Sequence, residues 1–187
     1  MACGGVKEAK VGEAFLAQAD GTEPAPDGPT VVVLPGRADP LPEGEVVRLA
    51  IDRDVLYGEI APLIAQVRAR GGSPALLVGD RRQRLAAIAI DGWAPGETSI
   101  RVVATADGKA CVSLPGIDEA KCVRTTQARV DRSYVRELVR EAFKASSLRR
   151  VTVEAEAGLR WGDVVRAVDG ARTCCAGERI AVALKSY

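Results

Sequence analysis

The chain has 187 residues, enough for one large domain or two small ones. Apolar residues make up 47% of it but aromatic residues only 4%, so its core must be built from aliphatic side chains. With 26 basic and 25 acidic residues the net charge is +1, which gives no field that would attract nucleic acid or an anionic bilayer. Histidine is absent, and this removes the commonest general base and metal ligand. The composition therefore favours a protein that is not an enzyme, and no residue pattern indicates a cofactor or a metal site.

The first residues resemble the end of a bacterial lipoprotein signal. In such signals a small residue precedes a cysteine that becomes acylated, and Ala2-Cys3-Gly4 fits this order. The charged and apolar regions of a signal are missing. The pattern predicts a lipid anchor on Cys3, and the alternative is an ordinary Met-Ala start with an incidental cysteine.

The segment over residues 1–29 is predicted to be a tether. Residues 8–19 fit a short helix with Val11, Phe15 and Leu16 on one face. Residues 20–29 are rich in Pro and Gly, which favour neither helix nor strand and indicate a linker.

Two short motifs recur in the same order and divide the rest of the chain. Leu34-Pro35-Gly36 returns as Leu114-Pro115-Gly116, at an offset of 114 − 34 = 80. Ile51-Asp52-Arg53 returns as Val130-Asp131-Arg132, at an offset of 130 − 51 = 79. This recurrence predicts two tandem units, over residues 30–106 and 107–187.

Hydrophobic periodicity gives both units the same predicted order, ββαβαβ. In the first unit we expect strands over 30–34, 46–51, 75–78 and 99–104, and helices over 55–67 and 85–90. In the second unit we expect strands over 110–114, 122–130, 151–155 and 180–184, and helices over 134–143 and 159–168. The predicted fold class is α+β, with each unit a two-layer sandwich that carries both helices on one face of its sheet.

Four cysteines follow Cys3. Cys111 and Cys122 flank a predicted turn on two strands that can place them opposite each other, so this disulfide is favoured among the three possible pairings. Cys174 and Cys175 are adjacent, and they are either small buried side chains or a thiol redox site. No Cys-x-x-Cys spacing indicates zinc.

Two aspartates stand where a strand leads into a helix. Asp52 and Asp131 are therefore expected to accept hydrogen bonds from helix N–H groups. The functional alternative is a pair of equivalent acidic binding spots.

The remaining candidates for a site are two tryptophans and a basic turn. Trp161 lies on an apolar stripe and is expected in the core, whereas Trp93, near Gly92 and Pro95, is a candidate for a surface contact. The basic candidates for a partner contact are Arg81, Arg82 and Arg84.

The second unit resembles the periplasmic domain of the ExbD/TolR family. The resembling stretches are 128–132, 135–139, 151–155, 161–169, 176–177 and 180–184. The first unit resembles the family less, through 55–63 and 75–80. Members are inner-membrane proteins that transmit the energy of a proton-driven motor to envelope partners, through an acidic residue in an N-terminal transmembrane helix. This sequence shows no such helix, so the resemblance implies only the periplasmic interaction module.

These observations predict a non-catalytic periplasmic protein that binds or scaffolds within the bacterial cell envelope. Its expected partner is an envelope protein or peptidoglycan, with no nucleic acid and with membrane contact only through a lipid on Cys3. The oligomeric state stays open, a dimer included. The rival hypothesis is a small thiol-dependent enzyme or redox protein that uses Cys174 and Cys175. A cytoplasmic structural domain is a third interpretation, and it requires reduced cysteines.

Overall fold

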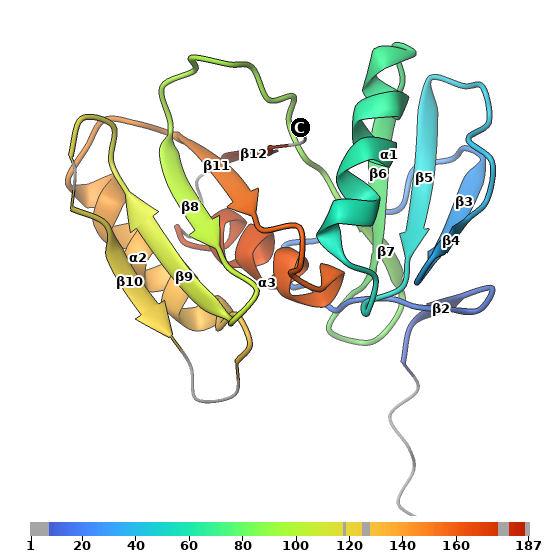
Figure 1. The fold of residues 1–187 in the computed structure, drawn as a ribbon, viewed down its shortest axis with the longest axis horizontal. Coiled ribbons are helices and arrows are strands. Elements are labelled where there is room, and N and C mark those ends of the chain that lie inside the picture. Colours follow the sequence, from blue (N-terminus) through green and yellow to red (C-terminus); the bar gives the residue numbers. More distant parts are fainter. Residues whose placement is uncertain (1–7, 118, 125–127, 176–179, 186–187) are drawn as a thin grey trace, which may run out of the picture.

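Two mixed β-sheets of five strands each form the frame of the molecule (Figure 1). The computed structural model describes residues 8–117, 119–124, 128–175 and 180–185. The first sheet has the order β4-β3-β5-β6-β7, from Arg37–Ala38, Thr30–Leu34, Val46–Ile51, Ser73–Gly79 and Leu85–Ile88. The second has the order β10-β9-β8-β11-β12, from Lys121–Arg124, Lys109–Ser113, Ile100–Ala104, Arg150–Ala155 and Ala181–Leu184. The helices are α1 (Tyr57–Ala69), α2 (Arg132–Lys144) and α3 (Trp161–Arg172). The predicted α+β class, with two sheets that each pack against helices, is confirmed.

The first sheet is buried on both faces. Its parallel strands β3, β5 and β6 read as nearly continuous apolar runs, as expected for strands covered on both sides. Alternate residues such as Leu49 and Leu76 join the main core beneath α1. Ala50 and Leu77 point to the opposite face, where the N-terminal segment covers them. The tether segment, from Glu8 onward, therefore lies packed against this sheet.

The helix predicted over residues 8–19 is wrong. The structure has a hairpin of two short strands there, β1 (Lys10–Val11) and β2 (Ala14–Phe15). Gly12 turns between them at φ 56°, a left-handed conformation that does not continue a helix. Ala14 and Leu16 are buried while Phe15 is exposed, so the burial period is that of a strand. The apolar face of the first sheet that these residues cover favours an extended segment, and this packing outweighs their helix propensity.

The helix predicted over residues 85–90 is also wrong, because residues 85–88 form the edge strand β7. The carboxylate of Asp80 accepts hydrogen bonds from the backbone N–H groups of Arg82 and Arg84. That turn sends the chain back antiparallel to β6. Ala86 and Ile88 then face the main core and Ala87 faces the N-terminal segment. The Ala-Ile-Ala-Ile alternation therefore has period 2.

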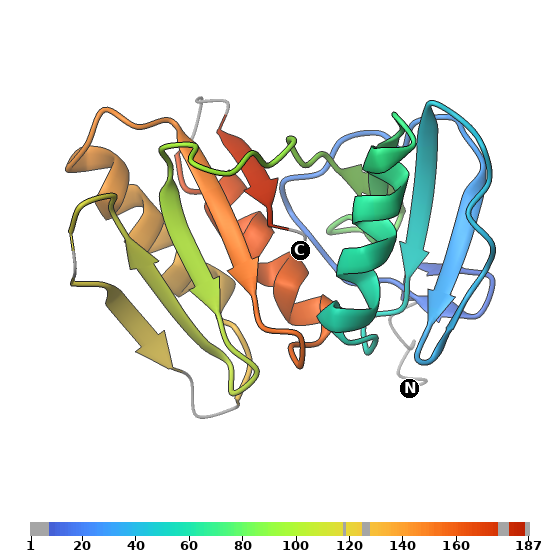
Figure 2. The same cartoon turned by 45° about the horizontal axis from the view of Figure 1, so that its top comes forward.

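The strand predicted to close the first unit belongs to the second sheet. β8 lies between β9 and β11, with Val151 opposite Ile100 and Ala155 opposite Ala104 in parallel register. Its buried side chains meet the helical layer of the second unit, where α2 and α3 lie on one face of the sheet (Figure 2). The crossing segment is fixed by Asp91, whose N–H donates to Val182 and whose carboxylate accepts the Val182 N–H. The first sheet thus carries one helix and the second carries two.

The strand predicted over residues 122–130 is shorter than expected. β10 ends at Arg124, and residues 128–131 lead into α2 without strand pairing. Residues 125–127 lie outside the described part of the chain. Over the other predicted elements of both units the structure has helices and strands of the expected type, within a few residues of the expected ends.

The structural repeat differs from the repeated motifs in the sequence. Leu34-Pro35-Gly36 and Leu114-Pro115-Gly116 both begin hairpin turns, with Gly36 at φ 70° and Gly116 at φ 73°, so their likeness is local. Equivalent elements are β5-α1-β6 and β11-α3-β12, each a strand, a helix and a parallel neighbouring strand. Their first strands and their helices begin at a common offset, 150 − 46 = 104 and 161 − 57 = 104.

The two equivalent helices begin against each other. Tyr57 N–H donates to Leu159 at 2.8 Å and Gly58 N–H donates to Ala157 at 2.9 Å. In return Trp161 N–H donates to Val55 at 2.8 Å and Gly162 N–H donates to Arg53 at 2.9 Å. We call this exchange the reciprocal junction. It satisfies amides at both helix starts that have no partner within their own helices, and it joins the two units into one continuous core.

Candidate functional site

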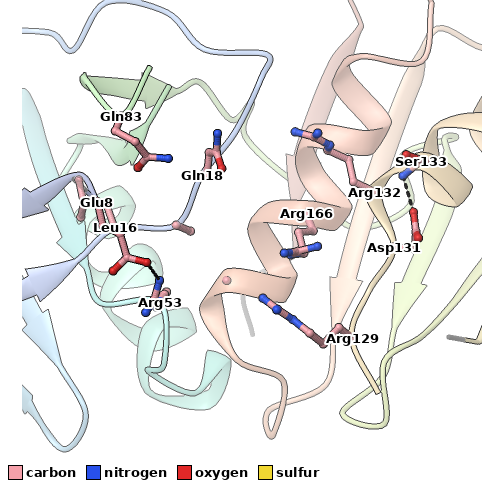
Figure 3. Close-up of a pocket in the computed structure, with 12 residues that line it drawn as sticks. Glu8, Leu16, Gln18, Arg53, Gln83, Arg129, Asp131, Arg132, Ser133 and Arg166 are labelled. Carbon is pink, nitrogen blue, oxygen red and sulfur yellow. Dashed lines mark hydrogen bonds and ion pairs between the residues drawn. The ribbon is translucent and has the colours of Figure 1, made fainter. Parts of the chain in front are cut away.

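A cleft opens beside the reciprocal junction, with a volume of about 480 Å³ (Figure 3). One wall comes from the N-terminal segment and the first unit, through Glu8, Leu16, Ala17, Gln18, Arg53 and Gln83. The other wall comes from the second unit, through Arg129, Asp131, Arg132, Ser133, Gly162 and Arg166. An adjoining hollow of about 640 Å³ shares Arg53, Arg129 and Gly162 with it and reaches Arg160. The lining of the cleft holds four arginines against two carboxylates, so it carries an excess of positive charge.

Arg132 is held in a buried network that also fixes the N-terminal segment. Its Nη1 donates to Asp169, which is fully buried, at 2.9 Å, and lies 2.8 Å from the carboxylate of Asp20. Asp169 also accepts the backbone N–H groups of Asp20, at 3.0 Å, and Gly21, at 2.6 Å. Burial raises the pKa of Asp20, but its hydrogen bonds to Arg81 and Arg132 outweigh this and hold the pKa below its usual value. Arg132 is therefore engaged as a structural residue.

Arg166 and Arg129 share one carboxylate at longer range. Their Nε atoms lie 3.9 Å and 4.0 Å from Oδ1 of Asp163, too far for a hydrogen bond. That oxygen instead accepts the backbone N–H of Val130 at 3.2 Å. Burial lowers the pKa of Arg166, and the positive charge of Arg129 lowers this pKa further. Two like charges therefore lie close together on one wall of the cleft.

Arg53 is the fourth arginine of the lining, and it forms an ion pair with a glutamate. Its Nη1 donates to Glu8 at 2.7 Å, and this ion pair ties the start of the described chain to the first unit. Figure 3 shows the pair on the wall opposite Arg129 and Arg166. The side chains of Gln18 and Gln83 lie on the same side as Arg53, so the arginine wall faces amide groups across the cleft.

The two aspartates expected to cap helices behave differently. Asp131 accepts the N–H groups of Ser133, at 2.8 Å, and Tyr134, so its capping of α2 is confirmed. The expectation for Asp52 is wrong, because α1 begins only at Tyr57. Asp52 accepts the N–H groups of Phe15, at 2.8 Å, and Asp54, at 3.0 Å. The reciprocal junction satisfies the start of α1 in place of a side-chain cap.

The predicted contact residues lie in two separate places. Arg81, Arg82 and Arg84 lie in the β6–β7 turn, which also carries Gln83. Arg81 forms an ion pair with Asp20, and Arg84 forms one with Asp80. Trp93 is half-buried in the segment between the sheets, with Lys185 Nζ 5.5 Å from its ring centre, and it does not line the cleft. Trp161 is fully buried, as predicted.

The expected disulfide is present. Cys111 and Cys122 stand directly opposite on β9 and β10, with their Cα atoms 4.0 Å apart. Cys174 is 1% exposed and Cys175 is half-buried, and both keep their thiols. Cys3, the expected lipid site, lies outside the described residues.

Sequence reasoning missed the arginines that define the cleft. Arg129 precedes α2 and Arg166 lies within α3, while Gln18 and Gln83 come from segments predicted to be a helix and a turn. Gln18 and Gln83 lie on one wall and Arg129 and Arg166 on the other, and the two walls face each other because the units pack together. The helical periodicity of residues 161–172 could place Arg166 on the polar side of α3, but no neighbouring residue in the sequence indicates what its side chain faces.

The chain is thus an α+β protein with two mixed five-stranded sheets and an arginine-lined cleft. Comparison with protein-family models, with curated proteins and with solved structures finds no match. No helix in the described ranges has the length and apolar character to cross a membrane. Within the same ranges no three acidic or cysteine side chains come together as a metal site would require.

Proposed function

We propose that this protein is a non-catalytic binding and scaffolding module of the bacterial cell envelope, and that the cleft between its units receives the partner. The observation that carries this proposal is the meeting of four arginines, from both units, around one cavity. Arginine suits the recognition of partner groups with negative charge, because its planar guanidinium presents several donors in a fixed geometry. The resemblance to the periplasmic domain of ExbD/TolR proteins supports an envelope protein or peptidoglycan as the partner.

The disulfide supports the proposed location in the periplasm. Disulfides persist in oxidising surroundings such as the bacterial periplasm and are rare in the cytosol. The Cys111–Cys122 bridge therefore indicates an oxidising compartment. Acylation of Cys3 belongs to the same proposal and would keep the module at a membrane surface.

The geometry of the cleft suits binding better than chemistry. Arg132 and Arg53 are tied to carboxylates, and Asp131 is occupied as a helix cap. The rival thiol hypothesis would need a reactive thiol at an accessible site. The burial of Cys174 argues against that role, because buried cysteines are typically inert.

Site-specific photo-crosslinking in the native host tests this proposal. A benzophenone side chain is placed at Gln18, which lines the cleft, and in a matched variant at Leu85, an exposed residue that does not. We expect an adduct at Gln18 alone, which mass spectrometry identifies as one envelope protein or as a peptidoglycan fragment. Equal adducts at both positions, or recovery of the protein in the cytoplasm with Cys111 and Cys122 reduced, would overturn the proposal.

A further inference from the structure

We infer that Arg166 and Arg129 form a subsite for an oxyanion, a carboxylate or a phosphate group, on the second-unit wall of the cleft. The inference rests on the proposed function, because it names the chemistry by which the cleft would hold its partner. It goes beyond that proposal in assigning the contact to two residues.

Asp163 is more deeply buried than the two arginines that it contacts. Its side chain is 9% exposed, whereas those of Arg166 and Arg129 are 39% and 56% exposed. The carboxylate thus lies beneath the guanidinium groups and not between them and the cavity. Both guanidinium groups therefore line the cleft above a buried carboxylate.

Arg132 and Arg53, the other two arginines of the lining, are already held in close ion pairs. Arg132 makes close ion pairs with Asp20 and Asp169, and Arg53 makes one with Glu8. In the described part of the chain Arg166 has only the 3.9 Å contact with Asp163 and donates no hydrogen bond. Its donors can therefore turn to a ligand without breaking a bond that the fold requires.

A bound anion would interact with the charges already present around Arg166. Arg129 and Arg166 repel each other, and Arg132 adds to the repulsion felt by Arg166, while Asp131 and Asp163 partly offset it. An oxyanion placed between the two guanidinium groups would relieve this repulsion and accept charge-assisted hydrogen bonds from both. Across the cleft, the amides of Gln18 and Gln83 can bind the polar groups next to the anion.

Calorimetric titration of the whole protein with inorganic phosphate, and separately with glutarate, tests the subsite. Sodium chloride at equal ionic strength is the reference. We expect saturable binding of at least one probe, weakened at least about tenfold by Arg166→Gln, since a hydrogen bond to a charged group commonly contributes this much. Arg37→Gln is the matched control, because it removes the same charge from an exposed pair with Glu13.

The outcomes separate the ligand sources and the two proposals. Saturation by phosphate alone indicates a phosphorylated ligand, and saturation by glutarate alone indicates a carboxylate. Arg166→Lys keeps the charge without the planar fork, and it should bind more weakly than wild type if Arg166→Gln does not fold. Titrations that match sodium chloride, or that are equal in wild type and Arg166→Gln, would overturn the subsite. Crosslinking at Gln18 would still decide whether the cleft holds a partner.

Discussion

At the scale of single residues, Asp20 links the N-terminal segment to both units. Its carboxylate lies 3.0 Å from Arg81 of the first unit and 2.8 Å from Arg132 of the second. Its pKa in the folded protein lies below the ordinary value of 3.8, so the ionised form is favoured by folding. The resulting stability is fully present above pH 3.8 and is lost as the pH falls through the lower, folded-state pKa.

Asp20→Asn should lower the free energy of unfolding by about 1–3 kcal/mol at pH 7, as expected for the loss of charged hydrogen bonds. The difference from wild type should shrink at acidic pH, because the wild-type carboxyl then becomes protonated. Urea unfolding at several pH values measures both effects. Asp27→Asn, at an exposed position in the same segment, is the control and should be nearly neutral. A difference that is the same at pH 7 and in strong acid would contradict the role given to Asp20.

At the scale of elements, the disulfide holds the edge hairpin of the second sheet. Cys111→Ser together with Cys122→Ser opens a cross-link with a sequence separation of 11 residues. We expect a loss of about 2–3 kcal/mol in unfolding free energy, because the unfolded chain gains freedom when this loop is released. Reduction of the wild type should give a similar loss, and Cys175→Ser should change little. Equal stability of the oxidised and reduced wild type would show that the bridge does not stabilise the fold.

The elements also show what the sequence could predict and what it could not. The stripe of Val135, Val139 and Phe143 identified α2, because an amphipathic helix on an open sheet must bury one face. The same reasoning failed for residues 8–19 and for β7, whose conformation is set by the sheet they cover or extend. β8 looked like any short apolar strand, and its membership of the second sheet depends on the crossing fixed by Asp91.

At the scale of the whole molecule, the reciprocal junction makes the two units one cooperative body. Each helix start depends on carbonyl groups of the other unit, and the main core is continuous across the boundary. The cleft could not be predicted for the same reason. Arg53 and Arg166 are 113 positions apart (166 − 53), and they line the same cleft because the two units pack together.

Gly58→Val should therefore weaken the entire fold and not one half of it. A Cβ at Gly58 would lie 3.1 Å from the Ala157 Cβ and 3.3 Å from its carbonyl oxygen, so a branched side chain forces the units apart. We expect a loss of about 1–3 kcal/mol, typical of overpacking, with a single melting transition retained. Calorimetry measures this, with Gly92→Val, where nothing lies within 4 Å of the added Cβ, as control. Two separate transitions in the wild type would contradict the cooperative body.

The hydrogen bond from the backbone N–H of Asp20 to the carboxylate of Asp169 also determines when folding can be completed. The two residues are 149 positions apart, so nearly the whole chain must leave the ribosome before the first segment finds its acceptor. Until then the amides of Asp20 and Gly21 lack this acceptor. Contacts between residues this distant in sequence form slowly, because a long loop must close first. The newborn chain therefore passes through a period in which its N-terminal segment has not yet bound the second unit.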